Sequence, residues 1–464
     1  MKKRDQYKRL FMLLTSGLLF VLMTGIYADI WYRHFAYSEE TGTYFYYRGN
    51  YVIIAMYALM LFFFNKIYGG LKVGQQRLFE SLYSQILTVL CVNLVTYLQL
   101  CLIGNWRFMD NLVPIAVMTV IDLVLVIGWV LLTRYIYIKL FPPREVVLIY
   151  GKYNPDSLER KVAGRADKYI IQETISANQA PGLIYEKMLQ YHNVMMLGIP
   201  MDLRNEMLKF CFENDIRCYI VPSVSDIMVR SAHDTHMFDT SMFLCRNMGL
   251  SADQRFLKRA FDIVVSLVVC VVTLPIMAII AILIKAYDGG PVLFTQDRLT
   301  QDGRIFKVYK FRSMRVDDGR NGYCMTRKDD DRITPVGRVL RNIHFDELPQ
   351  IFNILKGDMS LVGPRPECPA IAEQYTQMVP EFKYRLKVKA GLTGYAQVYG
   401  KYNTTPYDKL KLDMTYIMNY SFWLDIKLIL LTIRVLFIKE NTEGIDANQT
   451  TAATEEDLEK AGMI

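Results

Sequence analysis

The sequence predicts a multi-domain membrane protein with an N-terminal membrane region followed by two α/β regions. Apolar residues make up 52% of the 464 positions, and many gather in runs long enough for membrane helices. After the first such runs, short apolar segments alternate with helical patterns, which is typical of α/β domains. A chain of this length has room for two or three domains.

Four apolar runs occupy residues 1–140, and each approaches the roughly 20 residues that a membrane-spanning helix needs. The runs cover residues 10–28, 52–64 (extendable to 68), 82–103 and 113–132. Lys and Arg collect before the first run, between the second and third, and after the fourth. This distribution predicts four spans with both ends in the cytoplasm. No convincing cleavage site follows the first run, so we interpret it as an anchor and not as a signal peptide.

Asp122 lies within the fourth run, where contact between a carboxylate and lipid is costly. We therefore expect its side chain to face neighbouring helices. Packing between helices is one role for it, and a proton relay is the alternative.

The charge and cysteine content exclude several classes of protein. The net charge is +8, and the aromatic residues lie mostly in apolar runs, so we expect affinity for membrane surfaces and phosphate, and no nucleic-acid binding. The eight Cys are scattered without a CxxC pair. The sequence therefore predicts neither a zinc site nor a disulfide framework.

Residues 141–250 have the pattern of a parallel α/β domain. Short apolar strands are expected at 145–150, 168–175, 193–198 and 217–222, with a helix at 201–214 among the connections. Gly151 follows the first strand, but no GxGxxG motif does, so the segment lacks a dinucleotide-binding fingerprint. We expect a structural or dimerising module, which makes a homodimer possible; a bound nucleotide or other effector is the alternative.

A further apolar run, residues 262–284, has Pro275 near its middle and basic residues at both ends. Proline removes a backbone hydrogen bond and kinks a helix. Basic residues on both sides favour two cytoplasmic ends. We therefore expect a re-entrant helix, about 256–286, that breaks near Leu274–Pro275 and returns to the same face. A fifth span is the alternative.

Two adjacent acids, Asp346 and Glu347, precede Pro349 and an apolar-periodic segment, which predicts that a helix starts at the pair. Arg341 lies before the pair and Arg365 after it, within a GPRP turn. Carboxylates beside guanidinium groups suit a divalent metal and a phosphorylated substrate. The structural alternative is that the acids only cap a helix. A preceding strand-like segment adds four basic residues, namely Lys307, Lys310, Arg312 and Arg315.

Several blocks in this region carry a family resemblance. They are KRAFDIVVS (258–266), GGPVLFTQDR (289–298), FKVYKFRSM (306–314), the segment 332–367, GLTGYAQVYG (391–400) and KLDMTYIMNYSFWLDIKLILLT (411–432). In this order they resemble the bacterial sugar transferases, the monotopic polyprenyl-phosphate hexose-1-phosphate transferases. The resemblance implies a catalytic domain at 251–440 built on a re-entrant helix, and a Rossmann-like fold for the domain before it. The four N-terminal spans correspond to the large, multi-domain form of the family.

The resemblance also implies a reaction and residue roles. Asp346 would attack the sugar-bearing phosphate of a UDP-sugar, expel UMP and form a sugar-phosphoryl aspartate. Glu347, with Asp346, would bind Mg²⁺. Arg341 and Arg365 would clamp the phosphates, with Lys310 and Arg312 as further candidates. Undecaprenyl (polyprenyl) phosphate would then accept the hexose-1-phosphate on the cytoplasmic face of the bacterial inner membrane and start capsule, exopolysaccharide or O-antigen synthesis.

The sequence departs from the family pattern at His344 and Phe345, where a small hydroxyl residue and Leu are usual, and also at Leu299 and Tyr395. None of these changes removes a catalytic group, but they leave the sugar and nucleotide specificity open. For His344 we expect a packing or capping role, and a general base is the alternative.

The C-terminal part predicts an amphipathic helix at 422–438 that lies in the membrane interface with Trp423 at headgroup depth. Residues 441–464 form a polar tail. The alternative to an enzyme is a catalytically weak membrane scaffold that recruits polysaccharide export partners. The sequence does not identify the hexose or the polysaccharide.

Overall fold

The computed structural model divides the chain into two compact units. One contains Met1–Tyr150 with Pro155–Tyr219, and the other contains Gly151–Asn154 with Ile220–Ile464. The structure describes residues 3–38, 43–44, 47–72, 74, 76–103, 112–245, 249–315, 332–400 and 404–436. The predicted polar tail at 441–464 lies outside the described residues.

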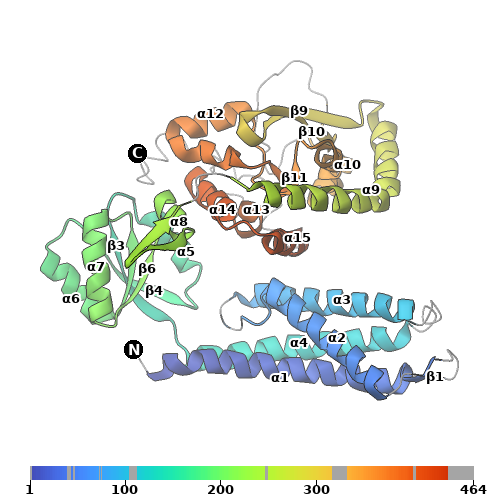
Figure 1. Cartoon of the computed structure of the whole chain (residues 1–464), viewed down its shortest axis with the longest axis horizontal. Coiled ribbons are helices and arrows are strands. Elements are labelled where there is room, and N and C mark those ends of the chain that lie inside the picture. Colours follow the sequence, from blue (N-terminus) through green and yellow to red (C-terminus); the bar gives the residue numbers. More distant parts are fainter. Residues whose placement is uncertain are drawn as a thin grey trace. The chain divides into compact units, whose positions relative to one another are not determined.

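The first unit begins with four long helices (Figure 1). They are α1 (Lys3–His34), α2 (Tyr47–Tyr68), α3 (Leu78–Ile103) and α4 (Val113–Leu140), and a short β-ribbon, β1 (Tyr37–Ser38) with β2 (Thr43–Tyr44), follows α1. The helices pack on a shared core that includes Trp31, Leu61 and Val92, while large apolar side chains such as Leu59 stay exposed. With α9 of the second unit, they are the five helices of the described chain that are long and apolar enough to cross a membrane. The four predicted apolar helices are therefore confirmed, and the chain is a membrane protein.

Polar contacts between these helices involve Asp122. Its side chain is fully buried, and its Oδ2 accepts a hydrogen bond from Asn93 Nδ2 at 3.1 Å. The Tyr57 hydroxyl donates to Asn93 Oδ1 at 3.3 Å. The expectation that Asp122 faces neighbouring helices is confirmed.

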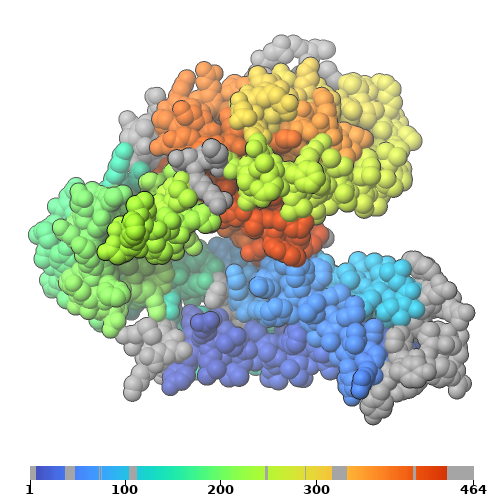
Figure 2. All heavy atoms as spheres, in the orientation of Figure 1, coloured from blue at the N-terminus to red at the C-terminus, as the bar shows by residue number. Residues whose placement is uncertain are grey.

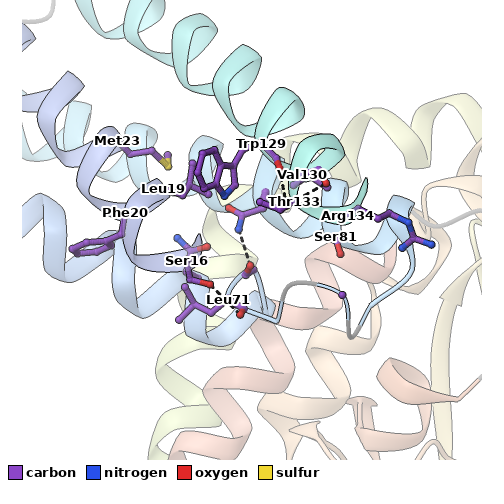
Figure 3. Close-up of a pocket in the computed structure, with 14 residues that line it drawn as sticks. Ser16, Leu19, Phe20, Met23, Leu71, Ser81, Trp129, Val130, Thr133 and Arg134 are labelled. Carbon is purple, nitrogen blue, oxygen red and sulfur yellow. Dashed lines mark hydrogen bonds between the residues drawn. The ribbon is translucent and has the colours of Figure 1, made fainter. Parts of the chain in front are cut away.

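A small cavity lies among the same helices, lined by Ser16, Leu71 and Trp129 among others (Figure 3). Three buried atoms that border it, Asn65 Oδ1, Gln85 Oε1 and Trp129 Nε1, have no hydrogen-bond partner in the described chain. The cavity volume is about 30 Å³.

The α/β part of this unit is a four-stranded sheet in the order β4-β3-β5-β6. Its strands are β3 (Arg144–Tyr150), β4 (Tyr169–Ser176), β5 (Asn193–Leu197) and β6 (Arg217–Ile220), joined through α5 (Asp156–Ala163), α6 (Pro181–Tyr191) and α7 (Met201–Glu213). β3 pairs in parallel with both β4 and β5, and its residues 146–149 are completely buried. The predicted parallel α/β arrangement is confirmed, because a central strand covered on both faces needs the continuous apolar run seen here.

The second unit starts earlier than the expected catalytic boundary at residue 251. After α8 (Val224–Arg230) comes a hairpin of β7 (His233–Met237) and β8 (Thr240–Leu244). Val224 and Ile227 of α8 belong to the same apolar core as Leu410 and Met414. Packing therefore joins α8 to the C-terminal unit, while the domain limits expected from the sequence stay predictions.

Helix α9 (Ala252–Asp288) runs through Pro275 as one α-helix and bends along its length, so that its two arms point in different directions (Figure 1). The predicted break is therefore a bend within a continuous helix, because one proline removes one backbone hydrogen bond without ending the helix. The second arm packs Met277 and Ile284 against Phe311 and Leu340. Many of the remaining apolar side chains of α9, such as Val271, are exposed.

The rest of the unit is an α/β domain with short strands. β9 (Leu293–Leu299) and β10 (Ile305–Phe311) form an antiparallel hairpin, and β11 (Ser360–Val362) pairs in parallel with β12 (Gly391–Thr393). The helices are α10 (Pro335–Asn342), α11 (Gln350–Lys356), α12 (Pro369–Met378), α13 (Tyr395–Tyr399), α14 (Pro406–Met418) and α15 (Phe422–Leu436), with 3₁₀ turns η2 (Gln301–Gly303), η3 (Phe345–Glu347) and η4 (Pro380–Lys387). Figure 2 shows the atoms of these elements as spheres. The apolar core of the domain includes residues of α11, β11, α14 and α15.

A buried ion pair attaches α9 to this domain. Lys258 Nζ lies 2.6 Å from Asp425 Oδ2 and donates to the Tyr416 hydroxyl at 3.2 Å. The Tyr416 hydroxyl donates to Asp425 Oδ1 at 2.8 Å. Because Lys258 and Asp425 expose only 7% and 1% of their side-chain surfaces, removing either partner strands a buried charge.

We predict that Lys258→Met destabilises the protein by about 3–5 kcal/mol, because the Asp425 carboxylate stays buried without its cation. The measurement is the thermal unfolding midpoint of the full chain in detergent. Arg255→Met, on an exposed position of the same helix, is the control and should unfold near the wild-type temperature. Equal midpoints for the two variants would contradict the prediction.

Candidate active site

Helix α10 leads the chain to the acid pair. The hydroxyl of Thr334 accepts a hydrogen bond from the Gly337 N–H at 2.9 Å and caps the start of α10. A Cβ at Gly337 would collide with the carbonyl group of Ser313, so only glycine permits this close packing. Arg341 lies in the last turn of the helix. The cap and the close contact thus fix the helix against the exit of β10.

The acid pair lies on η3, and not in the first turn of a helix. His344 has a left-handed backbone (φ 58°) and reverses the chain after α10. Asp346 and Glu347 follow within one 3₁₀ turn, and α11 begins only at Gln350, after Pro349. The sequence predicted that α11 starts at the acid pair, and this prediction is wrong by a few residues. The left-handed backbone of His344 is followed by the 3₁₀ turn η3, and α11 begins only after that turn.

Asn353 holds α11 in register with β10. Its Oδ1 accepts from the Tyr309 N–H at 2.9 Å, and its Nδ2 donates to the Lys307 carbonyl at 2.8 Å. Its side chain is fully buried. Asn353 thereby fixes the helix that follows the acid pair to the strand that carries Lys310. The sequence analysis missed this residue, since a lone Asn in an apolar helix gives no signal of its partner.

Arg259 of α9 holds the other end of α11. Its Nη1 and Nη2 donate to the carbonyls of Ile354 and Leu355 at 2.6 and 2.8 Å, in the last turn of α11, where carbonyls have no partner four residues further along the helix. Three residues along α9, Asp262 accepts from the Leu361 N–H at 3.0 Å. The apolar helix α9 is therefore bonded directly to the element next to the acid pair.

Glu347 is the most heavily bonded acid of the site. Its Oε1 lies 2.7 Å from Lys310 Nζ and 2.9 Å from Arg365 Nη2, and its side chain is 13% exposed. Burial alone would raise the pKa of Glu347, but Arg365 and Lys310 together hold that pKa well below its ordinary value. Glu347 is therefore anionic at neutral pH.

Asp346 has the opposite shift. Burial raises the pKa of Asp346 above its ordinary value, Glu347 raises it further, and Lys310 and Arg341 oppose the rise. Neighbouring acids whose environments separate their pKa values are suited to different tasks. The more basic carboxylate of Asp346 is the better nucleophile, and the anionic Glu347 is the better cation ligand.

The loop that carries Arg365 is held by two arginines, the buried Arg385 and the half-buried Arg298. Arg385 Nη2 donates to the Arg365 carbonyl at 2.9 Å, and Arg298 Nη1 donates to the Pro366 carbonyl at 3.1 Å. Arg385 is itself paired with Asp413 at 2.8 Å and with Glu367 at 3.3 Å. These residues position Arg365 without contacting Glu347. The sequence analysis missed them because they come from separate segments that only folding brings together.

The other predicted basic residues differ in how far their side chains are buried. Arg312 is buried with its guanidinium against Gly290, where a Cβ would collide with it. Lys307 and Arg315 are exposed. The structure therefore brings Lys310 and Arg365 into contact with Glu347, and Arg341 lies near enough to lower the pKa of Asp346. Phosphate binding by Lys310, Arg312, Arg341 and Arg365 stays a prediction.

His344 serves the turn through its backbone, whose N–H donates to the Arg341 carbonyl at 3.2 Å. Its Nδ1 is buried and has no hydrogen-bond partner in the described part of the chain. His344 precedes η3 without a side-chain cap hydrogen bond, so the expected capping role is not seen, while the packing role and the general-base alternative stay predictions.

The donor set near the pair fits Mg²⁺. The described residues contain no group of three or more His, Cys, Asp or Glu that could hold a metal ion. Mg²⁺, however, commonly uses one or two carboxylates together with substrate phosphates and water. Asp346 and the second oxygen of Glu347 supply such a pair.

A family model described as bacterial sugar transferase matches residues 253–439, which include the acid pair and its cations. The chain is also 37% identical over 189 residues to a UDP-glucose:undecaprenyl-phosphate glucose-1-phosphate transferase from Caulobacter vibrioides, a match that covers 40% of this chain and 71% of that protein. The chain belongs to the bacterial sugar transferase family.

Two longer relatives match similar lengths. A UDP-N-acetylgalactosamine-undecaprenyl-phosphate N-acetylgalactosaminephosphotransferase from Aeromonas hydrophila is 36% identical over 241 residues, which are 51% of this chain and 56% of that protein. A UDP-glucose:undecaprenyl-phosphate glucose-1-phosphate transferase from Escherichia coli is 41% identical over 196 residues, which are 41% of this chain and 42% of that protein. The chain thus spans about half the length of these curated relatives.

We predict that Asn353→Leu lowers the unfolding midpoint, because the Tyr309 N–H and the Lys307 carbonyl each lose a hydrogen-bond partner. Each loss should reduce the free energy of unfolding by about 1–3 kcal/mol. Asn342→Leu, at an exposed position near the end of α10, is the control. Thermal unfolding of both variants in detergent measures the effect. A wild-type midpoint for Asn353→Leu would show that these bonds do not hold α11.

Proposed function

We propose that the chain transfers a hexose-1-phosphate from a UDP-sugar to undecaprenyl phosphate and releases UMP. The observation that carries this proposal is the acid pair with oppositely shifted pKa values, in which Glu347 contacts both Lys310 and Arg365. Family membership supports it, because the relatives are named as transferases of this type. The product would be the first lipid-linked sugar of a capsule, exopolysaccharide or O-antigen.

In the first step, a carboxylate oxygen of Asp346 attacks the phosphorus that bears the sugar. A bond forms between this oxygen and phosphorus, the phosphoanhydride bond breaks, and UMP leaves with the bridging oxygen. In the second step, an oxygen of undecaprenyl phosphate attacks the same phosphorus and frees the Asp346 carboxylate. One phosphoanhydride bond replaces another, so the overall exchange needs no external energy source.

The neighbouring residues have separate tasks in this scheme. Mg²⁺, held by Glu347 and Asp346 with the substrate phosphates, would neutralise charge on the phosphoryl oxygens. Arg365 and Arg341 would bind the phosphates as guanidinium forks, and Lys310 would keep Glu347 oriented while adding positive charge. None of these residues has to give up a proton at neutral pH.

The membrane arrangement belongs to the same proposal. Helices α1–α4 would form a four-span transmembrane bundle, and α9 would enter one leaflet and return. Both arms of α9 contact the same domain, through Arg259 on the first arm and Ile284 on the second, which supports a re-entrant helix. α15, with exposed Trp423, would lie in the interface. The active site would then lie on the cytoplasmic face of the bacterial inner membrane, where UDP-sugars occur.

We predict that Asp346→Asn abolishes transfer, because a carboxamide cannot form the acyl phosphate. The assay incubates the purified full chain with Mg²⁺, undecaprenyl phosphate and a panel of UDP-sugars, and measures UMP. Asp302→Asn, at an exposed position of the turn between β9 and β10, is the matched control and should keep wild-type turnover.

Wild-type turnover by Asp346→Asn would refute the covalent step. Failure of the wild-type chain to release UMP from any UDP-sugar would refute the transferase and favour the scaffold alternative. Mass spectrometry of the protein after UDP-sugar addition without lipid tests directly for the phospho-sugar adduct on Asp346.

The acid limb of the pH–rate profile should report the Asp346 carboxyl group. Because burial raises its pKa above the ordinary 3.8, kcat/KM should fall on acidification at a pH above that value. Lys310 lowers the pKa of Asp346, so Lys310→Met should move the limb to higher pH. A limb that moves to lower pH, or stays in place, would contradict the role of Lys310.

A further inference from the structure

Four basic side chains of the first unit meet where the end of α4 lies against the turn before β4. They are Arg77 before α3, Arg134 of α4, and Arg165 and Lys168 in the turn between α5 and β4. Arg77 Nη2 donates to the Gly164 carbonyl of this turn at 3.0 Å, and Arg134 Nη2 lies 3.7 Å from Asp167 Oδ2. Three segments far apart in the sequence thus bring cations together, and we call these four residues the basic cluster.

The cluster carries more positive charge than the carboxylate at its centre compensates. Asp167 is shared between Arg165 at 3.1 Å and Arg134 at 3.7 Å, and the second distance is too long for a hydrogen bond. The Lys168 ammonium has no hydrogen bond or ion pair among the residues that the structure describes. Burial is the main reason that the pKa of Lys168 falls to about 8, and the charges of Arg165 and Lys8 lower it further. Lys168 is still cationic at neutral pH, so an anion beside it would be stabilised.

The position of the cluster along α4 corresponds to the depth of lipid headgroups. The helix has 28 residues and is about 42 Å long at a rise of 1.5 Å per residue, whereas the hydrocarbon core of a bilayer is about 30 Å thick. When α4 spans the membrane, its final turns therefore extend past the hydrocarbon, and these turns carry Arg134, Tyr135 and Tyr137. Basic and aromatic residues are typical of this depth. Basic residues at a helix end also set membrane topology, but that role needs no partial burial such as that of Arg134 and Lys168.

Apolar side chains beside the cluster favour a lipid over a soluble anion. Leu131 and Ile138 lie three residues before and four residues after Arg134, so they share its face of α4, and both are exposed. On α1, which packs against α4, Leu14 is exposed as well. The acyl chains of a phospholipid would cover this apolar surface, whereas a free phosphate would leave it in contact with its surroundings.

We propose that the basic cluster binds the phosphate of an anionic phospholipid, whose acyl chains lie along the exposed apolar side chains of α1 and α4. Arg134 and Arg165 would donate to the phosphate oxygens as guanidinium forks, and Lys168 would add a point charge. Because the cluster joins α4 to the turn before β4, the bound lipid would hold the membrane helices and the sheet together. The inference rests on the proposed membrane arrangement of α1–α4 and is independent of the sugar transfer.

The test compares three additives that separate the charge from the acyl chains. The purified full chain in a neutral detergent is heated with phosphatidylglycerol, with phosphatidylcholine of the same acyl chains, or with glycerol phosphate, which has no acyl chain. We expect phosphatidylglycerol to raise the thermal unfolding midpoint by about 2–4 °C or more, since a ligand that binds only the folded state stabilises it. The other two additives should leave the midpoint unchanged, and high salt should weaken the effect of phosphatidylglycerol.

Single substitutions locate the lipid on the protein. Lys168→Gln removes a charge of the cluster without leaving a carboxylate unpaired, and we expect it to reduce the rise in the midpoint by about half or more. Lys209→Gln removes the same charge from an exposed position of α7 in the same unit, so it is the matched control and should respond to the lipid like wild type. Lys168→Arg keeps the charge and should keep the response. If Lys168→Gln does not fold, Arg134→Gln replaces it.

Each contrary result identifies a different error. An absent rise with phosphatidylglycerol, or an equal rise with phosphatidylcholine, would overturn the recognition of charge by the cluster. An equal rise with glycerol phosphate would assign the cluster to a soluble phosphate in place of a lipid. A rise with phosphatidylglycerol that persists unchanged in both Lys168→Gln and Arg134→Gln would place the lipid elsewhere on the membrane helices. None of these readouts needs turnover, so they test the cluster even if the chain releases no UMP.

Discussion

The structure around the acid pair depends on the contact of one carboxylate oxygen with two cations. Lys310 comes from strand β10 and Arg365 from the loop after β11, and both reach Oε1 of Glu347. The Glu347 side chain is only 13% exposed, and the burial of its carboxylate is tolerable only while these cations compensate its charge. This requirement ties together β10, η3 and the Arg365 loop.

Contacts of α9 explain how an apolar helix and the acid pair are held in one domain. Arg259 and Asp262 of α9 bond to the backbone of α11 and β11, while Lys258 pairs with Asp425 of α15. Polar side chains on one face of an otherwise apolar helix thus fix its position relative to η3. A helix bound in this way defines the distance between the acid pair and the apolar surface of α9.

Much of this architecture was predictable because it follows from local patterns. Long apolar runs identified α1–α4 and α9, and short apolar strands between helical segments identified the parallel sheet. Asp346, Glu347, Arg341 and Arg365 were recognisable from their spacing and from the family resemblance. The start of α11 was misplaced, because the left-handed backbone of His344, which inserts a 3₁₀ turn, has no reliable signal in the sequence.

The amino-acid sequence by itself determined the membrane helices, the order of strands and helices, and the identity of the acids and most of their cations, because periodicity and residue type are local properties. Only the tertiary structure decided that Lys310 and not Lys307 contacts Glu347, and that Asn353 and Arg259 hold the two ends of α11. These features depend on contacts between segments far apart in the chain. The same holds for the separation of the two acid pKa values, because burial raises the pKa of both carboxyl groups and only the contacts of Glu347 with Arg365 and Lys310 bring its pKa below the ordinary value.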